Sequence, residues 1–173
     1  MVQKIKLMII DLIRIKYRIK EIIMKKKVAE CKGRLFIGGG SPTSLSRTTH
    51  LGHNTNFNGM IIKGQGHVYI GDNFHSGQNC LILTSNHNYE GSQIPYDSEN
   101  INKDVVIEDN VWLGDNVVIL PGSYIEEGAI IQAGSVVVNR IPKCAIAGGH
   151  PAKQFSCRSI DHYESLKSKK QFH

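Results

Sequence analysis

A six-residue repeat of apolar, turn-forming and small residues dominates residues 107–142. Six consecutive hexads begin with an aliphatic residue: Ile107, Leu113, Ile119, Ile125, Ile131 and Val137. Five of the six fourth positions hold Asn or Gly, which enter the left-handed backbone region at least cost: Asn110, Asn116, Gly122, Gly128, Gly134 and Arg140. This period suits neither a helix nor an alternating strand. It predicts a coil of short strands with a corner every six residues and stacked inward aliphatic side chains.

The same repeat begins earlier in the chain and is then interrupted once. Hexads start at Leu51 and Phe57, and the phase restarts at Ile70 after a short break. Residues 86–103 are polar and keep no six-residue phase. An excursion from a solenoid forms a loop on one face, often the binding face, and a loop of this length usually has a function. We therefore expect a functional loop at 86–103.

The N-terminal segment has a different pattern, in which apolar and basic residues are mixed without Gly or Pro. Residues 1–30 are predicted to form a basic amphipathic helix, and residues 1–27 carry nine Lys or Arg against two acidic residues. Its longest uncharged run is four residues, far below the roughly 20 that span a bilayer, and a signal peptide is not expected because charges cut the apolar core. Two interpretations remain: an arm that packs on the coil or a neighbouring subunit, or a helix on an anionic membrane surface.

The rest of the chain is nearly neutral, with twelve basic and thirteen acidic residues. A nucleic-acid-binding body would need a basic face, and none is visible. The four cysteines are widely spaced in the sequence, with no pair at the spacing of a metal site, and reduced thiols in the cytoplasm are expected: Cys31, Cys80, Cys144 and Cys157. We expect the coiled domain to span residues 31–158 and a C-terminal cap or tail to span residues 159–173.

The hexads and the following AGGHPAK resemble the hexapeptide-repeat acyltransferases, in particular the galactoside, maltose and polysaccharide O-acetyltransferases. The resemblance covers residues 51–153. It implies an all-β fold, a left-handed parallel β-helix, preceded here by an α-helix and followed by a short cap. It also implies acetyl-CoA as acyl donor, no metal, a saccharide acceptor, and a homotrimer with donor sites between subunits. The expected location is the cytoplasm, or the inner face of the cytoplasmic membrane if residues 1–27 bind lipid.

His87 is the candidate general base. The segment IGDNFHSGQNCLILTSNH, residues 70–87, matches without gaps the family segment that ends at the catalytic histidine. An acceptor hydroxyl is a poor nucleophile until its proton is removed, and a neutral imidazole can accept that proton at physiological pH. Glu90, Asp72 and a backbone carbonyl are the alternatives for orienting the ring. On composition alone, a histidine in a polar loop would simply be solvated.

The resemblance implies further contacts for both substrates. The acceptor side would comprise Asn58, Asn86, Tyr89, Glu90 and Tyr96. The donor side would comprise Trp112, Ala133, Ser135, Arg140, Lys153 and Arg158. Two sequence differences from the family occur near these donor residues. Val138 and Asn139 replace a common Thr-Lys, for which Arg140 would compensate, and His150 replaces a common Asn.

Four functions fit these residues. The first is acetyl transfer to a hydroxyl of a cell-surface polysaccharide or its precursor. The second is N-acetylation of an amino-sugar nucleotide, and the third is acetylation of a drug or serine. The fourth is a non-catalytic β-helix scaffold, against which the loop and His87 argue. Fold analogy alone does not name the acceptor.

Overall fold

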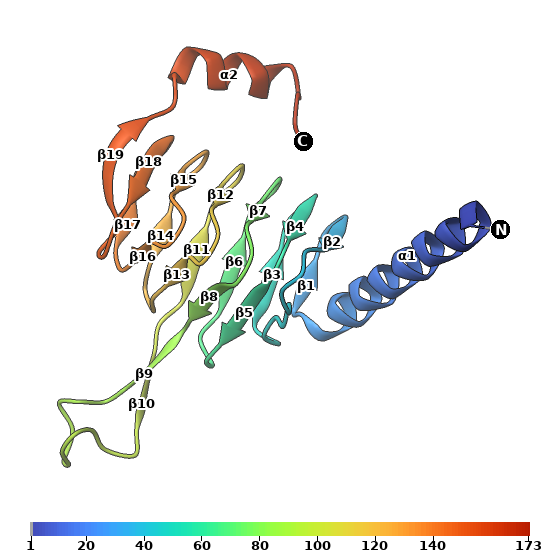
Figure 1. Ribbon diagram of the computed structural model, residues 1–173. Coiled ribbons are helices and arrows are strands. Elements are labelled where there is room, and N and C mark those ends of the chain that lie inside the picture. Colours follow the sequence, from blue (N-terminus) through green and yellow to red (C-terminus); the bar gives the residue numbers. More distant parts are fainter. Residues whose placement is uncertain (1) are drawn as a thin grey trace.

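The computed structural model describes residues 2–173 and contains a parallel β-helix between two α-helices (Figure 1). Helix α1 (Val2–Lys27) precedes the coils and helix α2 (Ile160–Ser168) follows them. Each coil passes through three parallel sheets, which we call faces A, B and C. Six strands form face A: β1 (Glu30–Cys31), β3 (Thr49–Leu51), β6 (Val68–Ile70), β11 (Val105–Ile107), β14 (Tyr124–Ile125) and β17 (Arg140–Ile141).

Seven strands form face B: β2 (Leu35–Ile37), β4 (Thr55–Phe57), β7 (His75–Ser76), β12 (Trp112–Leu113), β15 (Ile130–Ile131), β18 (Ala145–Gly148) and β19 (Lys153–Cys157). The last of these runs antiparallel to β18. Four strands form face C: β5 (Met60–Lys63), β8 (Cys80–Leu83), β13 (Val118–Ile119) and β16 (Val136–Val137).

The first residues of the hexads form the core. Ile107 is in register with Ile70 and Ile125 on face A, because each coil repeats the phase of the one before. Leu113 aligns with Ile131 on face B, and Ile119 with Val137 on face C. These side chains are buried and stack inside the coil, where removal of apolar surface from water is the main stabilising term. The predicted fold class, a parallel β-helix of hexapeptide repeats with an N-terminal helix and a short C-terminal cap, is confirmed.

The corners use the conformation that the fourth hexad positions predict. All five Asn and Gly residues there have positive φ, between 58° and 87°. Asparagines from successive coils also hydrogen-bond to one another. Asn54 Nδ2 donates to Asn73 Oδ1 at 3.1 Å, and Asn73 Nδ2 donates to Asn110 Oδ1 at 3.0 Å. The corner residue thus supplies both the backbone turn and a side-chain link between coils.

The sixth hexad departs from the repeat at its fourth position, whereas Val137 and Ile141 are buried as predicted. Arg140 is not a corner residue but lies in β17, where it pairs with Tyr124, and Ile141 pairs with Ile125 as an inward residue. The last coil is therefore two residues shorter than the preceding one. A long side chain such as arginine is costly in the left-handed region, and Cys144 takes that conformation instead, with φ of 56°.

The excursion between face C and face A is a projecting hairpin. Strands β9 (Ser85–His87) and β10 (Asn100–Asn102) pair antiparallel at its base, and the remainder extends away from the coils (Figure 1). Its tip is organised by Asp97. The Asp97 carboxylate accepts hydrogen bonds from Asn88 Nδ2 at 3.0 Å and from the backbone nitrogen of Glu99 at 2.9 Å.

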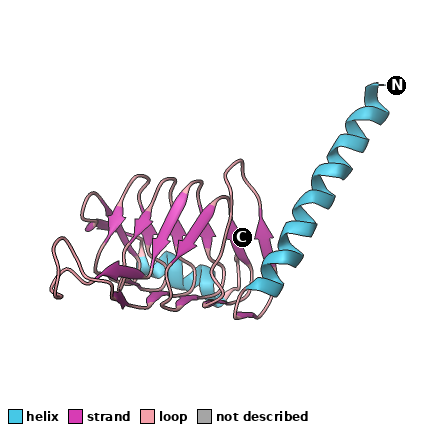
Figure 2. Cartoon of the chain, turned by 90° about the horizontal axis from the view of Figure 1, so that it is seen from below, coloured by secondary structure: helices cyan, strands magenta, loops and turns pink. Residues whose placement is uncertain are grey.

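The two helices lie at different parts of the β-helix. Helix α1 projects from the end that holds the first coil (Figure 2) and contacts it through its C-terminal half. Helix α2 follows β19 and returns beside face B (Figure 1). Among residues 2–173, no helix has both the length and the apolar content to cross a membrane.

Candidate functional site

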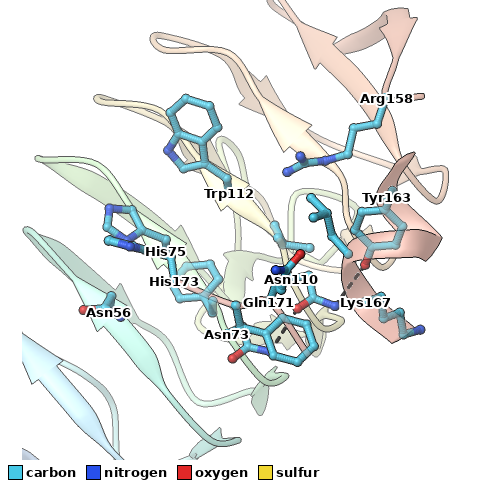
Figure 3. Close-up of a pocket in the computed structure, with 14 residues that line it drawn as sticks. Asn56, Asn73, His75, Asn110, Trp112, Arg158, Tyr163, Lys167, Gln171 and His173 are labelled. Atoms are coloured by element: carbon cyan, nitrogen blue, oxygen red, sulfur yellow. Dashed lines mark hydrogen bonds between the residues drawn. The ribbon is translucent and has the colours of Figure 1, made fainter. Parts of the chain in front are cut away.

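A groove of about 440 Å³ lies between face B and the C-terminal segment (Figure 3). Its β-helix wall contains an outward column in register, made of Asn56, His75 and Trp112. Each of these residues precedes an inward hexad residue, and because successive side chains of a strand alternate, it points outward. The opposite wall comes from α2 and the chain end, including Tyr163 and His173. Trp112 is 49% exposed, so its ring offers an apolar contact surface to a ligand.

His75 lies half-buried in the wall of this groove. Asn58 Nδ2 lies 3.1 Å from His75 Nε2 and also donates to the backbone oxygen of Ser76 at 2.9 Å. Because an amide nitrogen can only donate, His75 Nε2 is the acceptor and the ring proton is on Nδ1. Burial lowers the pKa of His75, and the nearby His173 lowers it further. The groove therefore contains a neutral imidazole at physiological pH.

Arg158 supplies positive charge beside the same groove (Figure 3). Its Nε donates to the backbone oxygen of Gly128 at 2.6 Å, and its guanidinium lies 5.8 Å from the centre of the Tyr163 ring. The Tyr163 hydroxyl donates to Glu127 at 2.8 Å and accepts from Asn110 Nδ2 at 2.9 Å. Burial and, to a smaller extent, the hydrogen bond to Glu127 raise the pKa of Tyr163, so its hydroxyl stays neutral. Tyr163 therefore adds no negative charge beside Arg158, and the guanidinium can attract an anionic group in the groove.

His87 lies in the projecting hairpin and is exposed. Its ring stacks on Tyr96, with centroids 3.9 Å apart and planes 6° from parallel. Asp72, one of the carboxylates expected to orient the His87 ring, hydrogen-bonds to His53 instead. It accepts from the backbone nitrogen and Nδ1 of His53, at 2.7 and 3.2 Å. Among the described residues, the side chain that contacts the His87 ring by stacking is Tyr96, not Asp72.

The structure does not bring the hairpin and the groove together within one chain. The hairpin leaves the coils between faces C and A, whereas the groove lies over face B, and α2 and the hairpin are on opposite sides in Figure 1. Asn86, Tyr89 and Glu90 are exposed in the hairpin with His87, and Asn58 instead contacts the groove through His75. The expected acceptor residues therefore fall into two separate groups.

The expected donor residues are also divided. Trp112 and Arg158 line one groove, but Arg140 lies on face A. Arg140 Nε donates to Glu126 at 2.6 Å, and its guanidinium lies 4.6 Å from the centre of the Tyr124 ring. Arg140 therefore does not line the groove that Arg158 borders, and its compensating role for the missing Thr-Lys stays a prediction.

The remaining donor residues lie at the corner between faces B and C or in β19. The Ser135 side chain points into the core, where its Oγ accepts from the backbone nitrogen of Gly149 at 3.2 Å. A fifth hexad position points inward, so a donor molecule could approach Ser135 only at its backbone, and the donor contact at Ser135 stays a prediction. Ala133 is exposed at the corner, next to the Gly134 carbonyl that hydrogen-bonds to His150. Lys153 is exposed at the start of β19.

Two groove residues, His75 and Asn56, were not selected from the sequence as binding residues. The hexad phase could have identified them, because each precedes an inward residue as Trp112 does. The cap wall, by contrast, has no repeat to predict it. Within the described residues, no three His, Cys, Asp or Glu side chains are arranged to hold a metal ion.

Comparisons with known proteins agree with this fold. The family described as bacterial transferase hexapeptide (six repeats) matches residues 104–139. A galactoside O-acetyltransferase of Lactococcus lactis is 34% identical over 132 residues, which cover 75% of this chain. The chain spans less than two thirds of the curated relatives it matches, namely 63% of that enzyme and 54% of a Saccharomyces cerevisiae relative.

Two solved structures with the same architecture contain acetyl coenzyme A or coenzyme A. A hexapeptide-repeat acetyltransferase of Vibrio cholerae in complex with acetyl coenzyme A has a TM-score of 0.67 and 25% identity, over 78% of this chain and 74% of its own. A galactoside acetyltransferase in complex with coenzyme A has a TM-score of 0.67 and 27% identity, over 84% of this chain and 72% of its own. This chain therefore carries a hexapeptide-repeat segment and shares the β-helix architecture of these acetyltransferases.

Proposed function

We propose that this protein is an acetyl-CoA-dependent acetyltransferase that acetylates a hydroxyl group of a saccharide. The observation that carries the proposal is the groove over face B, in which the exposed ring of Trp112 faces the same space as the guanidinium of Arg158. An apolar wall beside a fixed cation suits a thin pantetheine chain that ends in phosphates. Structures of this architecture bound to acetyl coenzyme A and coenzyme A support the assignment of the donor.

His87 is the proposed base. Its Nε2 or Nδ1 accepts the proton of the acceptor hydroxyl as the oxygen attacks the thioester carbonyl, and the C–S bond then breaks. The proton passes to the departing thiolate, which leaves as the free thiol of coenzyme A. The acetyl group moves directly to the acceptor oxygen, so no covalent acyl-enzyme is required. Stacking on Tyr96 limits rotation of the imidazole and holds it for this transfer.

The complete site is proposed to form between copies of the chain. His87 and the groove lie on opposite sides of one β-helix (Figure 1), so a base from one copy must meet the groove of another. A closed ring of three copies would pair every hairpin with one groove through identical interfaces. The hairpin then supplies Tyr89, Glu90 and Tyr96 to the acceptor, and the partner groove supplies the donor.

The acceptor is proposed to be a sugar hydroxyl in the cytoplasm, such as that of a polysaccharide precursor. Exposed tyrosines in the hairpin favour a sugar ring, because Tyr89 is 70% exposed and Tyr96 is 44% exposed. Aromatic rings cover the apolar face of a sugar, and their hydroxyls remain free to hydrogen-bond. The similarity to a galactoside O-acetyltransferase over 75% of this chain points the same way.

An acceptor screen with acetyl-CoA tests the proposal. Galactosides, maltose and an amino-sugar nucleotide are supplied separately, and release of the coenzyme A thiol is followed. Thiol release with a hydroxyl acceptor is expected, and Trp112→Ala should raise the KM for acetyl-CoA more than it lowers kcat. Thiol release only with the amine acceptor would replace O-acetylation by N-acetylation. Failure of coenzyme A to bind would overturn the donor assignment.

A further inference from the structure

Helix α1 carries an apolar stripe with a seven-residue repeat. Residues separated alternately by three and four positions are apolar through three heptads: Ile5, Met8, Leu12, Ile15, Ile19 and Ile22. These are the a and d positions of a coiled coil, with Ile5 at a and Met8 at d. All six side chains are between 47% and 58% exposed, so the stripe has no cover within the described part of this chain.

The stripe faces away from the β-helix. Residues on the opposite side of α1 are partly buried against the first coils, and they occupy b, c and f positions: Tyr17, Lys20, Glu21 and Met24. The Tyr17 hydroxyl donates to the backbone oxygen of Gly39 at 3.5 Å, and Lys27 Nζ donates to Ser44 Oγ at 3.3 Å. The first coils of the β-helix therefore hold one side of the C-terminal half of α1, and the other side faces outward (Figure 2).

The residues beside the stripe are complementary to a parallel copy of the same helix. In a parallel coiled coil, a g residue faces the e residue five positions later on its neighbour. Asp11 at g would face Lys16 at e, which is an attractive pair, and Arg18 at g would face Ile23, which adds apolar contact. Asp11 already lies 3.5 Å from Arg14 within its own helix, but both side chains are well exposed and free to re-pair.

The identity of the stripe residues indicates how many helices would associate. Isoleucine at both a and d disfavours two-stranded coils and shifts the preference to three or four strands. The a positions hold Ile5, Leu12 and Ile19, and two of the three d positions hold Ile15 and Ile22. Lys26 continues the a series at the end nearest the body, and a charged residue at one a position is a known device for fixing register.

We propose that α1 is an assembly helix, which forms a parallel coiled coil with α1 of other copies of this chain and most favourably has three strands. The occupant of the stripe is therefore the same stripe of a second and a third copy. The coil would hold the chains together from one end of the β-helix, while α1 keeps its contacts with its own first coil. This inference is independent of the proposed acetyl transfer, because it concerns a helix that touches neither the groove nor the hairpin.

Site-directed cross-linking of the full chain tests the proposal. In a background with Cys31→Ser and Cys157→Ser, Ile15→Cys places a thiol on the stripe, and Ile13→Cys places one at a b position. The two side chains are similarly exposed, at 55% and 47%. Each chain then offers one accessible thiol, so a short bismaleimide should link Ile15→Cys chains into covalent dimers and leave Ile13→Cys chains monomeric. Equal linking at both positions, or no linking at either, would overturn the proposal.

Charge reversal and salt separate the coil from a membrane-bound helix. Asp11→Lys should weaken Ile15→Cys cross-linking, and adding Lys16→Asp should restore it. The excess of basic residues repels neighbouring copies, so added salt should preserve or raise the cross-linked fraction. On a membrane the opposite holds, because Asp11→Lys would increase capture by phosphatidylglycerol vesicles and salt would release the protein. That pattern, without cross-linking at Ile15→Cys, would assign the stripe to lipid instead.

Discussion

At the scale of single residues, two histidines lie in different surroundings. His75 is half-buried, accepts a hydrogen bond from Asn58 and has a lowered pKa, so it is a fixed neutral group in the groove wall. His87 is exposed and stacked on Tyr96. A base must reach the proton that it removes, and an exposed ring on a projecting hairpin can approach a substrate held by another copy. The difference favours His87 as base and His75 as a wall residue.

His87→Ala should therefore remove the base without disturbing the fold. General-base catalysis contributes roughly 10²- to 10⁴-fold, and turnover should fall by about that factor. Coenzyme A binding and the Tm should be unchanged, because the hairpin carries no core hexad. The checks are thiol release, coenzyme A titration and thermal melting.

His67→Ala is a suitable control for this experiment, because His67 lies beside face A in a stack with His50 and Tyr69. It should retain full turnover. Unchanged activity in His87→Ala would refute the base assignment and direct attention to Glu90. A lower Tm in that variant would instead make His87 a structural residue.

At the scale of elements, the partly buried carboxylate of Glu127 helps to attach α2 to the β-helix. Glu127 lies at a corner between faces A and B, where Lys167 Nζ approaches to 2.5 Å and the Tyr163 hydroxyl to 2.8 Å. Lys143 bridges to the same carboxylate at 3.6 Å and to Glu164 at 2.8 Å. Since α2 has no fully buried residue, these polar contacts hold the cap in place and thereby complete one wall of the groove.

Glu127→Gln should loosen this cap. Burial alone would raise the pKa of Glu127, but hydrogen bonds from Lys167 and Tyr163 and the charges of Lys167 and Lys143 outweigh it and lower the pKa overall. The stabilisation is therefore complete above the ordinary value near 4.5 and is lost as pH falls through the lower folded value. A loss of about 1 kcal/mol at pH 7 corresponds to roughly 2–4 °C in Tm for a domain of this size.

Melting curves between pH 3 and pH 7 measure this effect. The parent protein should lose Tm steeply in the acid range, and Glu127→Gln should begin lower and show a shallower loss. Glu164→Gln is the matched control, because among the described residues the Glu164 carboxylate pairs with Lys143 alone, and its side chain is 45% exposed. Equal effects of the two substitutions would contradict a special role for the Glu127 carboxylate.

At the scale of the whole molecule, the two halves of the proposed site require a second copy. The hairpin and the groove lie on opposite sides of the β-helix, and the apolar stripe of α1 is uncovered. The β-helix itself is rigid, because each coil hydrogen-bonds to the next along three faces. Folding alone cannot bring His87 to Trp112, so assembly is the step that would complete catalysis.

Mixing a variant without the base and a variant with a weakened donor groove should restore activity at low acetyl-CoA if the site is shared. His87→Ala retains the groove, and Trp112→Ala retains the base. In a randomly mixed 1:1 closed ring, about a quarter of the interfaces combine an intact hairpin with an intact groove. Thiol release at low acetyl-CoA should therefore reach roughly that fraction of the parent value after co-expression.

The doubly substituted chain co-expressed with His87→Ala is the control, and it should remain inactive because no copy carries the base. Failure of the two single variants to complement, together with a monomer mass in light scattering, would contradict a shared site.

The hexads by themselves determined the fold, because a six-residue repeat leaves the chain one regular way to bury its aliphatic side chains. They also determined the outward direction of Trp112 and the interruption that holds His87. Tertiary structure alone decided which outward residues share a groove, since α2 approaches face B through contacts that follow no repeat, such as Tyr163 with Asn110. It likewise assigned Asp72 to His53 and Arg140 to Glu126, because the partner of a charged side chain depends on which coils lie beside it.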